Sequence, residues 1–248
     1  MTIGEGTKMH VWEVLTRSDD NTAYGDVPIS EVVDSVTGTP RVGLEIGCNC
    51  GATGAELKRR FPDLHYIGVE TCAAAADIAK ERLDQVITED FLAWNGRLEL
   101  PEDRPVDLVV ATDVLEHLYN PWGTLKKIRS VLSSDARLYA TIPNVRNLWL
   151  LGELAKGNWN YERVGLLDIT HIRFFTLATA IQMFESTGYE VLSVMAIKDA
   201  RLPDLTPPPD QLVNVQTGEL TLHALDQNAV MELTTLKFLI VATPLAAE

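Results

Sequence analysis

A short glycine-rich turn carries the first residues whose types and spacing could bind a ligand. The turn reads Glu45-Ile46-Gly47-Cys48-Asn49-Cys50-Gly51. Glycine lets the backbone turn tightly and lets a ligand approach main-chain atoms. A dinucleotide site requires Gly-x-Gly-x-x-Gly before a helix that faces a pyrophosphate, whereas this turn reads Gly-x-Asn-x-Gly and follows a carboxylate, Glu45. The turn therefore disfavours a pyrophosphate and favours a positively charged ligand without phosphate.

Three acidic residues follow the turn in the order that a nucleoside ligand needs. Glu70 lies after Gly51 at close to the spacing, about 20 residues, at which nucleotide sites place the acid that binds the ribose hydroxyls. We expect Asp90 to accept a hydrogen bond from the adenine amino group and Phe91 to pack near the ring. Asp113 ends a further strand. S-adenosylmethionine, with a sulfonium, an ammonium, a ribose and an adenine, matches this set.

Two histidines are candidates for proton transfer to or from an acceptor. A hydroxyl that receives a methyl group needs a base, because a protonated hydroxyl is a poor nucleophile. His171 is the first candidate, with Asp168 to orient it, and His117 is the second, just after a strand end that carries Glu116. The alternative for both is structural, as histidines that hydrogen-bond to the backbone or to Asp168.

The cysteines do not predict a metal centre. Cys48 and Cys50 lie within the glycine-rich turn, and Cys72 follows Glu70, so the three resemble a ligand set only superficially. No acidic cluster typical of a magnesium site stands out either, and we expect no metal. Three cysteines cannot form a disulfide framework, which is typical of a reduced, cytoplasmic protein.

The elements that must position these residues alternate between strands and helices. Apolar runs and helical periodicity predict strands over 41–46, 65–70, 85–88, 106–111 and 138–142, and helices over 29–36, 54–61, 72–83, 121–132 and 176–188. Such alternation produces βαβ units and a parallel, doubly wound sheet. Two closing strands, at 189–197 and 237–243, are separated by a proline-rich loop over 202–209 rather than a full helix. They predict an antiparallel hairpin at the sheet edge.

The length of 248 residues, 46% of them apolar, predicts one domain over 26–248 after an N-terminal arm over 1–25. We expect a lid-like insertion over 145–175 and a surface excursion over 200–235. The insertion follows a strand at the end of the sheet where doubly wound folds bind ligands. It is rich in leucine and tryptophan, which favours a lid or a homodimer contact. Its aromatic residues either line an acceptor site or cover the core: Trp149, Trp159 and Tyr161.

The charge of the chain excludes several classes of partner. A net charge of −14 repels phosphate backbones, so nucleic acid and anionic membranes are poor candidates. No apolar run approaches the roughly 20 residues of a membrane span, and the N-terminus lacks the pattern of a secretory signal. A cytoplasmic protein is expected.

The series of motifs resembles the class I S-adenosylmethionine-dependent methyltransferases. The resemblance is carried by 44–48 with Gly51, by 69–70, by 89–91 and by Asp113-Val114-Leu115-Glu116-His117-Leu118. Two later stretches, 142–147 and 168–176, are similar to a bacterial subgroup associated with polysaccharide or glycan biosynthesis. The resemblance covers about 42–243 and implies an α/β, Rossmann-like, seven-stranded sheet, mostly parallel with an antiparallel final strand.

One position departs from the family pattern. The family usually has glycine where this chain has Asn49. Asparagine tolerates a positive φ better than most residues, so the turn can still form. The amide side chain would then crowd the methionine part of the cofactor or hydrogen-bond to its carboxylate.

The resemblance implies an enzyme that transfers a methyl group from S-adenosylmethionine to a small molecule. The leading hypothesis is a hydroxyl acceptor on a sugar, such as a sugar nucleotide, or on a glycan precursor. One alternative is N-methylation of an amine, and another is a methyltransferase-like module without turnover. A nicotinamide-dependent oxidoreductase would share the sheet but lacks its pyrophosphate-binding turn.

Overall fold

The computed structural model describes residues 25–89, 98, 100–101 and 104–246 of the chain. The sequence-based expectations for 1–24, Asp90 and Phe91 lie outside these residues. Among the helices built from described residues, none has the length and apolar character to cross a lipid bilayer.

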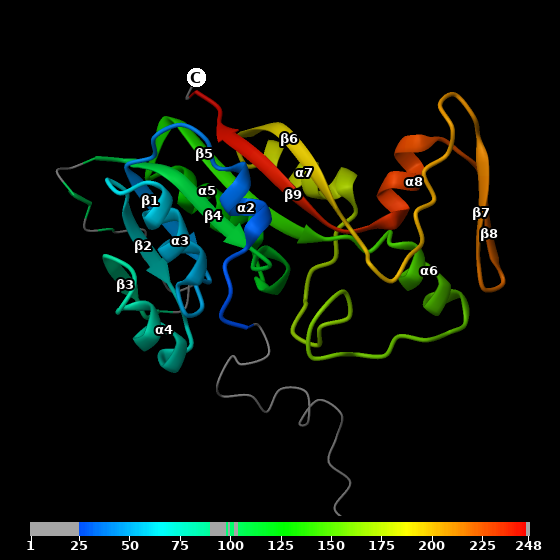
Figure 1. Ribbon diagram of the computed structural model, residues 1–248, viewed down its shortest axis with the longest axis horizontal. Coiled ribbons are helices and arrows are strands. Elements are labelled where there is room, and N and C mark those ends of the chain that lie inside the picture. Colours follow the sequence, from blue (N-terminus) through cyan, green and yellow to red (C-terminus); the bar gives the residue numbers. More distant parts are fainter. Residues whose placement is uncertain (1–24, 90–97, 99, 102–103, 247–248) are drawn as a thin grey trace, which may run out of the picture.

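Seven strands form one sheet in the order β3-β2-β1-β4-β5-β9-β6 (Figure 1). The strands are β1 (Val42–Ile46), β2 (His65–Val69), β3 (Gln85–Ile87), β4 (Val106–Thr112), β5 (Leu132–Pro143), β6 (Tyr189–Lys198) and β9 (Thr235–Pro244). Strands β1 to β5 are parallel, and β9 lies antiparallel between β5 and β6. The expected sheet, mostly parallel with an antiparallel final strand, is confirmed.

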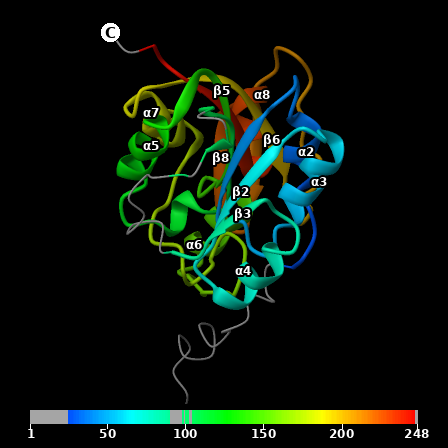
Figure 2. The same cartoon turned by 90° about the vertical axis from the view of Figure 1, so that its left-hand side faces the viewer.

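Helices cover both faces of this sheet (Figure 2). One face packs against α2 (Ser30–Ser35), α3 (Ala52–Arg60) and α4 (Ala73–Ala79), and the other against α5 (Pro121–Arg129) and α7 (Leu177–Glu185). The helix predicted over 72–83 is shorter than expected, because a turn follows Ala79. The strand predicted over 138–142 is longer and begins at Leu132. The carboxyl ends of β1, β2, β4 and β5 meet at one edge, as a parallel sheet requires.

Close packing under the first strands depends on two glycines. The ring of Tyr66 in β2 is fully buried. A Cβ on Gly43 of β1 would lie 2.5 Å from Tyr66 Cδ2, and a Cβ on Gly54 of α3 would lie 2.4 Å from Tyr66 Cε1. The absence of side chains at Gly43 and Gly54 therefore lets α3 sit directly over β1 and β2, which fixes the direction in which the glycine-rich turn leaves the sheet.

The region between β6 and β9 differs from the prediction. Instead of a loop alone, it forms the hairpin β7 (Val213–Thr217) and β8 (Leu220–Leu225), followed by helix α8 (Gln227–Thr234). These elements pack against α6 (Leu148–Ala155), and the contact is made by an apolar cluster that includes Leu148, Val215, Val230 and Leu233. The sequence did not indicate these elements because their apolar cluster is completed by Leu148 and Leu151 of α6, which lies far away in the sequence.

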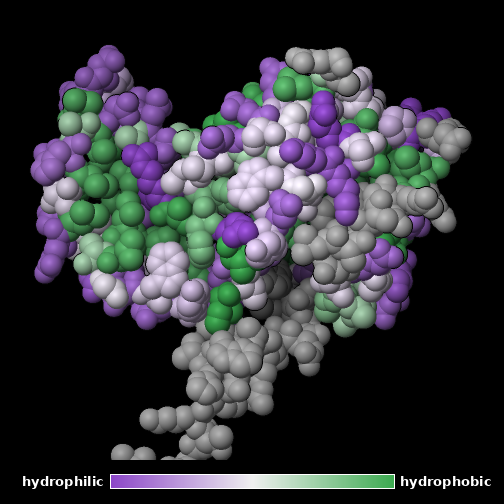
Figure 3. Space-filling model, turned by 180° about the vertical axis from the view of Figure 1, so that it is seen from behind, coloured by the Kyte–Doolittle hydropathy of each residue, from purple (hydrophilic) through white to green (hydrophobic). Residues whose placement is uncertain are grey.

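We call α6, β7, β8 and α8 the small unit. It lies at the end of the molecule opposite β1–β3 (Figure 1). Seen from behind, this end carries a broad apolar surface (Figure 3). The small unit therefore has an apolar cluster of its own beside the main sheet, and the segments 145–175 and 200–235, expected to be separate excursions, meet in it.

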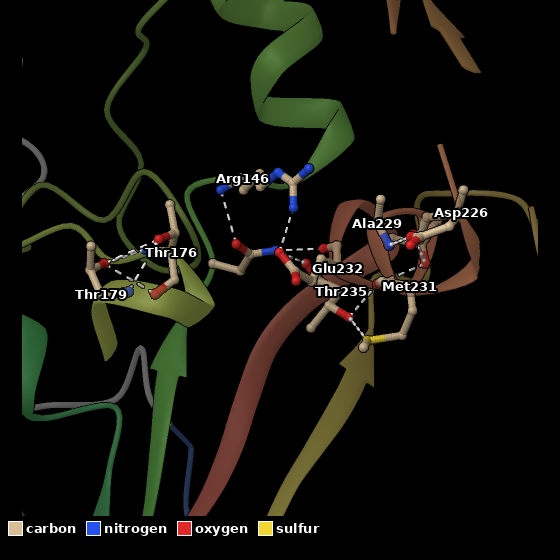
Figure 4. A network of polar contacts seen from close by, with 11 residues as sticks. Arg146, Thr176, Thr179, Asp226, Ala229, Met231, Glu232 and Thr235 are labelled. Carbon is tan, nitrogen blue, oxygen red and sulfur yellow. Dashed lines mark hydrogen bonds and ion pairs between the residues drawn. The ribbon is translucent and has the colours of Figure 1, made fainter. Parts of the chain in front are cut away.

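A polar network joins the small unit to the sheet (Figure 4). Arg146, just after β5, forms an ion pair with Glu232 of α8 at 2.5 Å. The Asn144 side-chain amide donates to the backbone oxygens of Glu232 and Thr235, at 2.7 and 3.0 Å. The Asn147 amide donates to the same Thr235 oxygen at 3.1 Å. These bonds fix the start of β9 against the end of β5.

Candidate functional site

The glycine-rich turn adopts the left-handed conformation three times. Gly47, Asn49 and Gly51 have φ angles of 69°, 47° and 77°. The backbone N–H groups of Gly47 and Cys48 donate to the Val69 oxygen at 2.8 and 3.1 Å, which folds the turn over the end of β2. The tight turn predicted from the sequence is confirmed, and asparagine occupies the position at 49 in the conformation expected of a glycine.

A cavity of about 250 Å³ lies between this turn and the carboxyl ends of β1, β2 and β4. We call it the turn cavity. It is lined by five of the residues predicted to bind the cofactor, namely Glu45, Gly47, Asn49, Glu70 and Asp113, and by His117. A smaller cavity of about 170 Å³ shares Gly47, Glu70, Asp113 and His117 with it and extends to Glu89, next to the predicted adenine contact.

Gly51 has a different position from the other predicted residues. It is buried, and a Cβ there would lie 3.2 Å from both Ala79 Cβ and Leu83 Cγ. Its backbone N–H donates to the Cys48 oxygen at 2.8 Å. Gly51 does not line the turn cavity, and it shapes that cavity by closing the turn.

The segment 25–29 forms one wall of the turn cavity, which the sequence did not indicate. The Asn49 side-chain amide donates to the Gly25 oxygen at 2.9 Å. Arg82 pairs with both carboxylate oxygens of Asp26, at 2.5 and 2.8 Å, and the Ile29 N–H donates to Thr53 Oγ1 at 3.1 Å. The Asn49 side chain, expected beside the methionine part of a cofactor, thus holds this wall.

Glu45 is the most deeply buried acid of the turn cavity, with 2% of its surface exposed. Its Oε2 has no hydrogen-bond partner among the described residues. Burial raises the pKa of Glu45 to about 8. The sequence suggested a charged carboxylate at this strand end, whereas the structure gives a carboxyl that is neutral at pH 7 until a positive group comes close.

Glu70 is held at the end of β2 by backbone donors. Its Oε2 accepts from the Asn49 N–H at 2.9 Å and its Oε1 from the Cys72 N–H at 2.7 Å. Oε1 also accepts from Thr71 Oγ1 at 3.4 Å, whereas Oε2 retains a further lone pair, because each carboxylate oxygen has about two acceptor sites. Glu70 lines both cavities, so it can accept from a hydroxyl group of a ligand there.

Asp113 stands where the turn cavity meets a second one. Its φ is 51°, and its carboxylate accepts from Thr141 Oγ1 at 2.8 Å and from Lys237 Nζ at 2.6 Å. Lys237 comes from β9, the antiparallel strand. Sequence reasoning missed it, although a lysine at the start of an apolar strand is a signal that it faces an acid or a cavity.

The second cavity, which we call the insertion cavity, has a volume of about 240 Å³. One wall comes from the insertion and the others from the ends of β4, β5 and β9. Its lining includes Asp113, Glu116, His117, Leu166, Asp168, His171 and Lys237. Asp113 and His117 also line the turn cavity, so the two cavities meet at these side chains.

His117 has one ring nitrogen fixed by the insertion. Its Nδ1 lies 3.0 Å from Thr170 Oγ1 and 3.2 Å from the Thr170 backbone oxygen. Thr170 Oγ1 donates its own proton to Asp168 Oδ1 at 2.6 Å. Thr170 Oγ1 and the Thr170 backbone oxygen must therefore both accept from His117, so Nδ1 carries a proton. In the neutral ring, Nε2 then carries a lone pair. Asp168, expected to orient His171, orients His117 through Thr170.

His171 lies beside His117 and is 7% exposed. The ring centroids are 4.6 Å apart in an edge-to-face arrangement, and His171 Nε2 is 3.8 Å from Glu116 Oε1. Burial, followed by the nearby His117, lowers the pKa of His171, which keeps the ring neutral at pH 7. Burial raises the pKa of Glu116 well above its usual range.

The aromatic residues of the insertion do not line either cavity. Trp149 stacks under the Arg201 guanidinium at 4.0 Å, and Trp159 meets Phe174 edge to face at 5.6 Å. Tyr161 is 46% exposed. The sequence left open whether these aromatic residues line an acceptor site or cover the core. The two tryptophans pack against a buried apolar cluster and so cover the core.

Part of the chain is similar to a known protein family. The methyltransferase domain family matches residues 44–138, from β1 into β5, a stretch that includes Glu70, Glu116 and His117. The trans-aconitate 2-methyltransferase of Methylobacterium radiotolerans is 30% identical over 107 residues, which are 42% of this chain and 39% of that protein. The chain thus matches well under half the length of this curated relative.

Solved structures resemble the chain over nearly its whole length. A possible histamine N-methyltransferase of Thermotoga maritima has a TM-score of 0.54 at 20% identity, covering 94% of this chain and 92% of that one. The [4+2]-cyclase SpnF has a TM-score of 0.58 at 14% identity, covering 95% of each chain. Such likeness confirms the Rossmann-like fold of class I methyltransferases, a class whose methyl donor is S-adenosylmethionine. The cyclase is a reminder that one fold hosts different reactions.

Proposed function

We propose that this chain is an enzyme that transfers a methyl group from S-adenosylmethionine to a hydroxyl of a small molecule, with a sugar or glycan precursor as the leading acceptor class. The observation that carries this proposal is the meeting of two cavities at Asp113 and His117. One cavity has the residue types that suit the donor, and the other has groups that can bind and deprotonate an acceptor.

The turn cavity fits S-adenosylmethionine by its own chemistry. The unpartnered Oε2 of Glu45 suits an ammonium group, because a buried carboxyl oxygen without a partner is costly. Glu70 keeps an acceptor site on Oε2 that suits a ribose hydroxyl. A Cβ on Gly47 would lie 2.6 Å from Val114 Cγ2, so only glycine leaves the turn this close to β4. When bound, the cofactor supplies a methyl group on a sulfonium that a nucleophile can take.

The insertion cavity supplies the groups that a hydroxyl acceptor needs. Asp113, Glu116 and Lys237 offer hydrogen-bonding partners for a polyhydroxylated molecule. His117 and His171, the two predicted catalytic residues, project into the same space and are the groups that prepare the acceptor oxygen for attack. Much of the rate enhancement would come from holding this oxygen at the border between the cavities.

The broader setting follows from charge and composition. A net charge of −14 supports a small-molecule acceptor rather than nucleic acid or an anionic membrane. The chain has three cysteines, too few for a disulfide framework, and this supports a cytoplasmic location. The alternatives to a hydroxyl acceptor are an amine and a carboxylate, the carboxylate because the Methylobacterium relative is a trans-aconitate methyltransferase. The chain could also act as a homodimer.

Calorimetric titration with S-adenosylmethionine, S-adenosylhomocysteine and NAD tests the donor half of the proposal. We expect one micromolar site per chain for the first two ligands and none for NAD. Incubation with labelled donor and panels of sugar nucleotides, amines and carboxylic acids then tests the acceptor. Loss of donor binding in a folded protein would overturn the proposal, and binding without any methylated product would favour a module without turnover.

The variant His171→Ala separates the acceptor classes. Loss of nearly all transfer, with donor affinity unchanged, is expected for a hydroxyl acceptor that must lose a proton. A mild loss would favour an amine acceptor, which carries its own lone pair once neutral. The exposed His223→Ala on β8 is the matched control.

A further inference from the structure

We propose that Glu116, His117 and His171 together bind one divalent transition-metal ion at the border between the turn cavity and the insertion cavity. The binding of the ion is independent of the proposed methyl transfer, and its role in catalysis rests on that proposed function. This inference reverses the sequence-based expectation of no metal.

The three side chains are close enough to share an ion. One ligand atom from each residue, a carboxylate oxygen of Glu116 and a ring nitrogen of each histidine, lies within 4.8 Å of the others. Ligands at about 2.1 Å from a tetrahedral ion are separated by about 3.4 Å. His171 Nε2 and Glu116 Oε1, at 3.8 Å, are near that separation already. Small side-chain rotations would bring the remaining atoms into range.

Glu116 supplies the independent sign that a positive group belongs here. Its side chain is 1% exposed, and neither carboxylate oxygen has a hydrogen-bond partner among the described residues. Buried carboxylates are normally paired, hydrogen-bonded or bound to a metal. The cation that lines the same cavity, Lys237, lies 2.6 Å from Asp113 and neutralises that acid instead. The chain thus holds an acceptor group with no partner at the place where the two histidines converge.

His117 shows the second mark of a metal ligand. Its Nδ1–H is held by Thr170, and Thr170 in turn by Asp168, which leaves the Nε2 lone pair free. Metal-binding histidines typically donate their other ring proton in this way, because the bond fixes the tautomer and the ring orientation. The backbone at Glu116 is fixed as well, because the Glu116 backbone oxygen accepts from the N–H groups of Ile172 and Arg173.

The ligand types select the kind of ion. Two imidazoles and one carboxylate suit Zn²⁺, Mn²⁺, Fe²⁺ or Co²⁺, whereas Mg²⁺ and Ca²⁺ prefer oxygen ligands. Three protein ligands leave at least one position open, as in catalytic sites. An acceptor hydroxyl in the insertion cavity could fill that position. The ion would then lower the pKa of the hydroxyl, whose proton passes to water, and the histidines would act as ligands rather than as bases.

The first experiment measures metal binding without any methyl transfer. Purified protein is treated with a chelator and titrated with Zn²⁺, Mn²⁺ and Co²⁺ by calorimetry, with the visible absorption of Co²⁺ as a second signal. We expect one ion per chain. We expect at least tenfold weaker binding in Glu116→Gln and in His117→Ala, and unchanged binding in the exposed control His223→Ala. Circular dichroism checks that each variant is folded.

Two outcomes would overturn the inference. One is the absence of saturable binding of all three ions by the folded wild-type chain. The other is equal affinity in wild type, Glu116→Gln and His117→Ala, which would assign the ion to another place. Titration with S-adenosylmethionine in the same samples keeps the proposals separate. Donor binding and transfer that persist in excess chelator would refute the ion's role in catalysis and leave the proposed function standing. Metal binding without donor binding would leave the ion site standing and refute the proposed function.

Discussion

The two cavities are built in different ways. The turn cavity is formed mainly by local sequence, in which Glu45, Gly47 and Asn49 follow one strand directly and Glu70 ends the next. The insertion cavity gathers residues from the end of β4, from 164–171 and from the start of β9. A site made from the ends of consecutive strands can be recognised from short sequence motifs. A site that depends on an antiparallel strand and a long insertion requires the tertiary structure.

The two cavities also hold their acids differently. In the turn cavity, Glu70 is bound by backbone N–H groups, while Glu45 is buried with one free oxygen. In the insertion cavity, Asp113 is paired with Lys237, and neither oxygen of Glu116 has a hydrogen-bond partner among the described residues. Among the described residues, each cavity therefore combines one acid whose oxygens are bonded with one buried acid that has an oxygen without a hydrogen-bond partner.

The largest expected effect concerns stability and the buried acid of the turn cavity. The pKa of Glu45 is about 8 in the folded chain and near 4.5 when exposed. The unfolded chain thus releases a proton between these pH values and the folded chain does not, so Glu45 lowers wild-type stability as pH rises. Relative to wild type, Glu45→Gln should gain about 1.4 kcal/mol of unfolding free energy per pH unit, on the order of 4 kcal/mol from pH 5 to pH 8.

Urea denaturation of both proteins from pH 5 to pH 8 measures this difference. The exposed Glu190→Gln serves as control and should show a flat difference. A flat difference for Glu45→Gln as well would mean that Glu45 is ionised in the folded chain.

The next effect concerns the ligand affinity of the turn cavity. Glu70→Ala removes the acceptor for the Asn49 and Cys72 N–H groups and the proposed partner of the ribose. We expect S-adenosylmethionine to bind about 100-fold more weakly, or about 2.7 kcal/mol, by calorimetry. Glu81→Ala, at an exposed position nearby, should bind like wild type. Unchanged affinity in Glu70→Ala would remove Glu70 from the cofactor site.

A smaller effect tests whether the two cavities work separately. Lys237→Met leaves Asp113 without its ion pair, which is partly exposed. Stability should fall by about 1 kcal/mol, and turnover should fall about tenfold, more than donor affinity. Measuring turnover and the donor Kd in the same variant checks this. A larger change in Kd than in turnover would assign Lys237 to the cofactor.

The smallest effect concerns the backbone of the turn. Asn49 has a φ of 47°, which costs most residues about 1 kcal/mol. Asn49→Ala should therefore be less stable than Asn49→Gly by roughly that amount in thermal unfolding, although both lose the bond to Gly25. Equal stability of the two variants would show that the turn relaxes when the amide is removed.

Much of the fold could be predicted because each parallel strand is a short apolar run with a polar residue at its end. The sequence therefore predicts that residues at those ends, such as Glu70 and Asp113, lie close together, and both line the turn cavity. The small unit was missed because its apolar face is completed by α6, which the sequence places far from β7 and β8.

The lining of the insertion cavity could be predicted only in part. The sequence points to His117 and His171 as candidates but does not indicate that the Glu116 carboxylate lies beside them, because burial without a hydrogen bond cannot be seen in a sequence. Lys237 and the wall at 25–29 were missed, since both reach the site through contacts between distant segments.

The wall at 25–29 has a practical consequence for where the domain begins. The family match starts at residue 44, but the turn cavity includes residues that precede it by almost 20 positions. A fragment that begins at the match would lack α2, the Asp26–Arg82 pair and the Gly25–Asn49 bond. It would keep every recognisable motif and present an open groove in place of a cavity. The smallest piece of this chain able to enclose a ligand is larger than the piece that sequence comparison recognises.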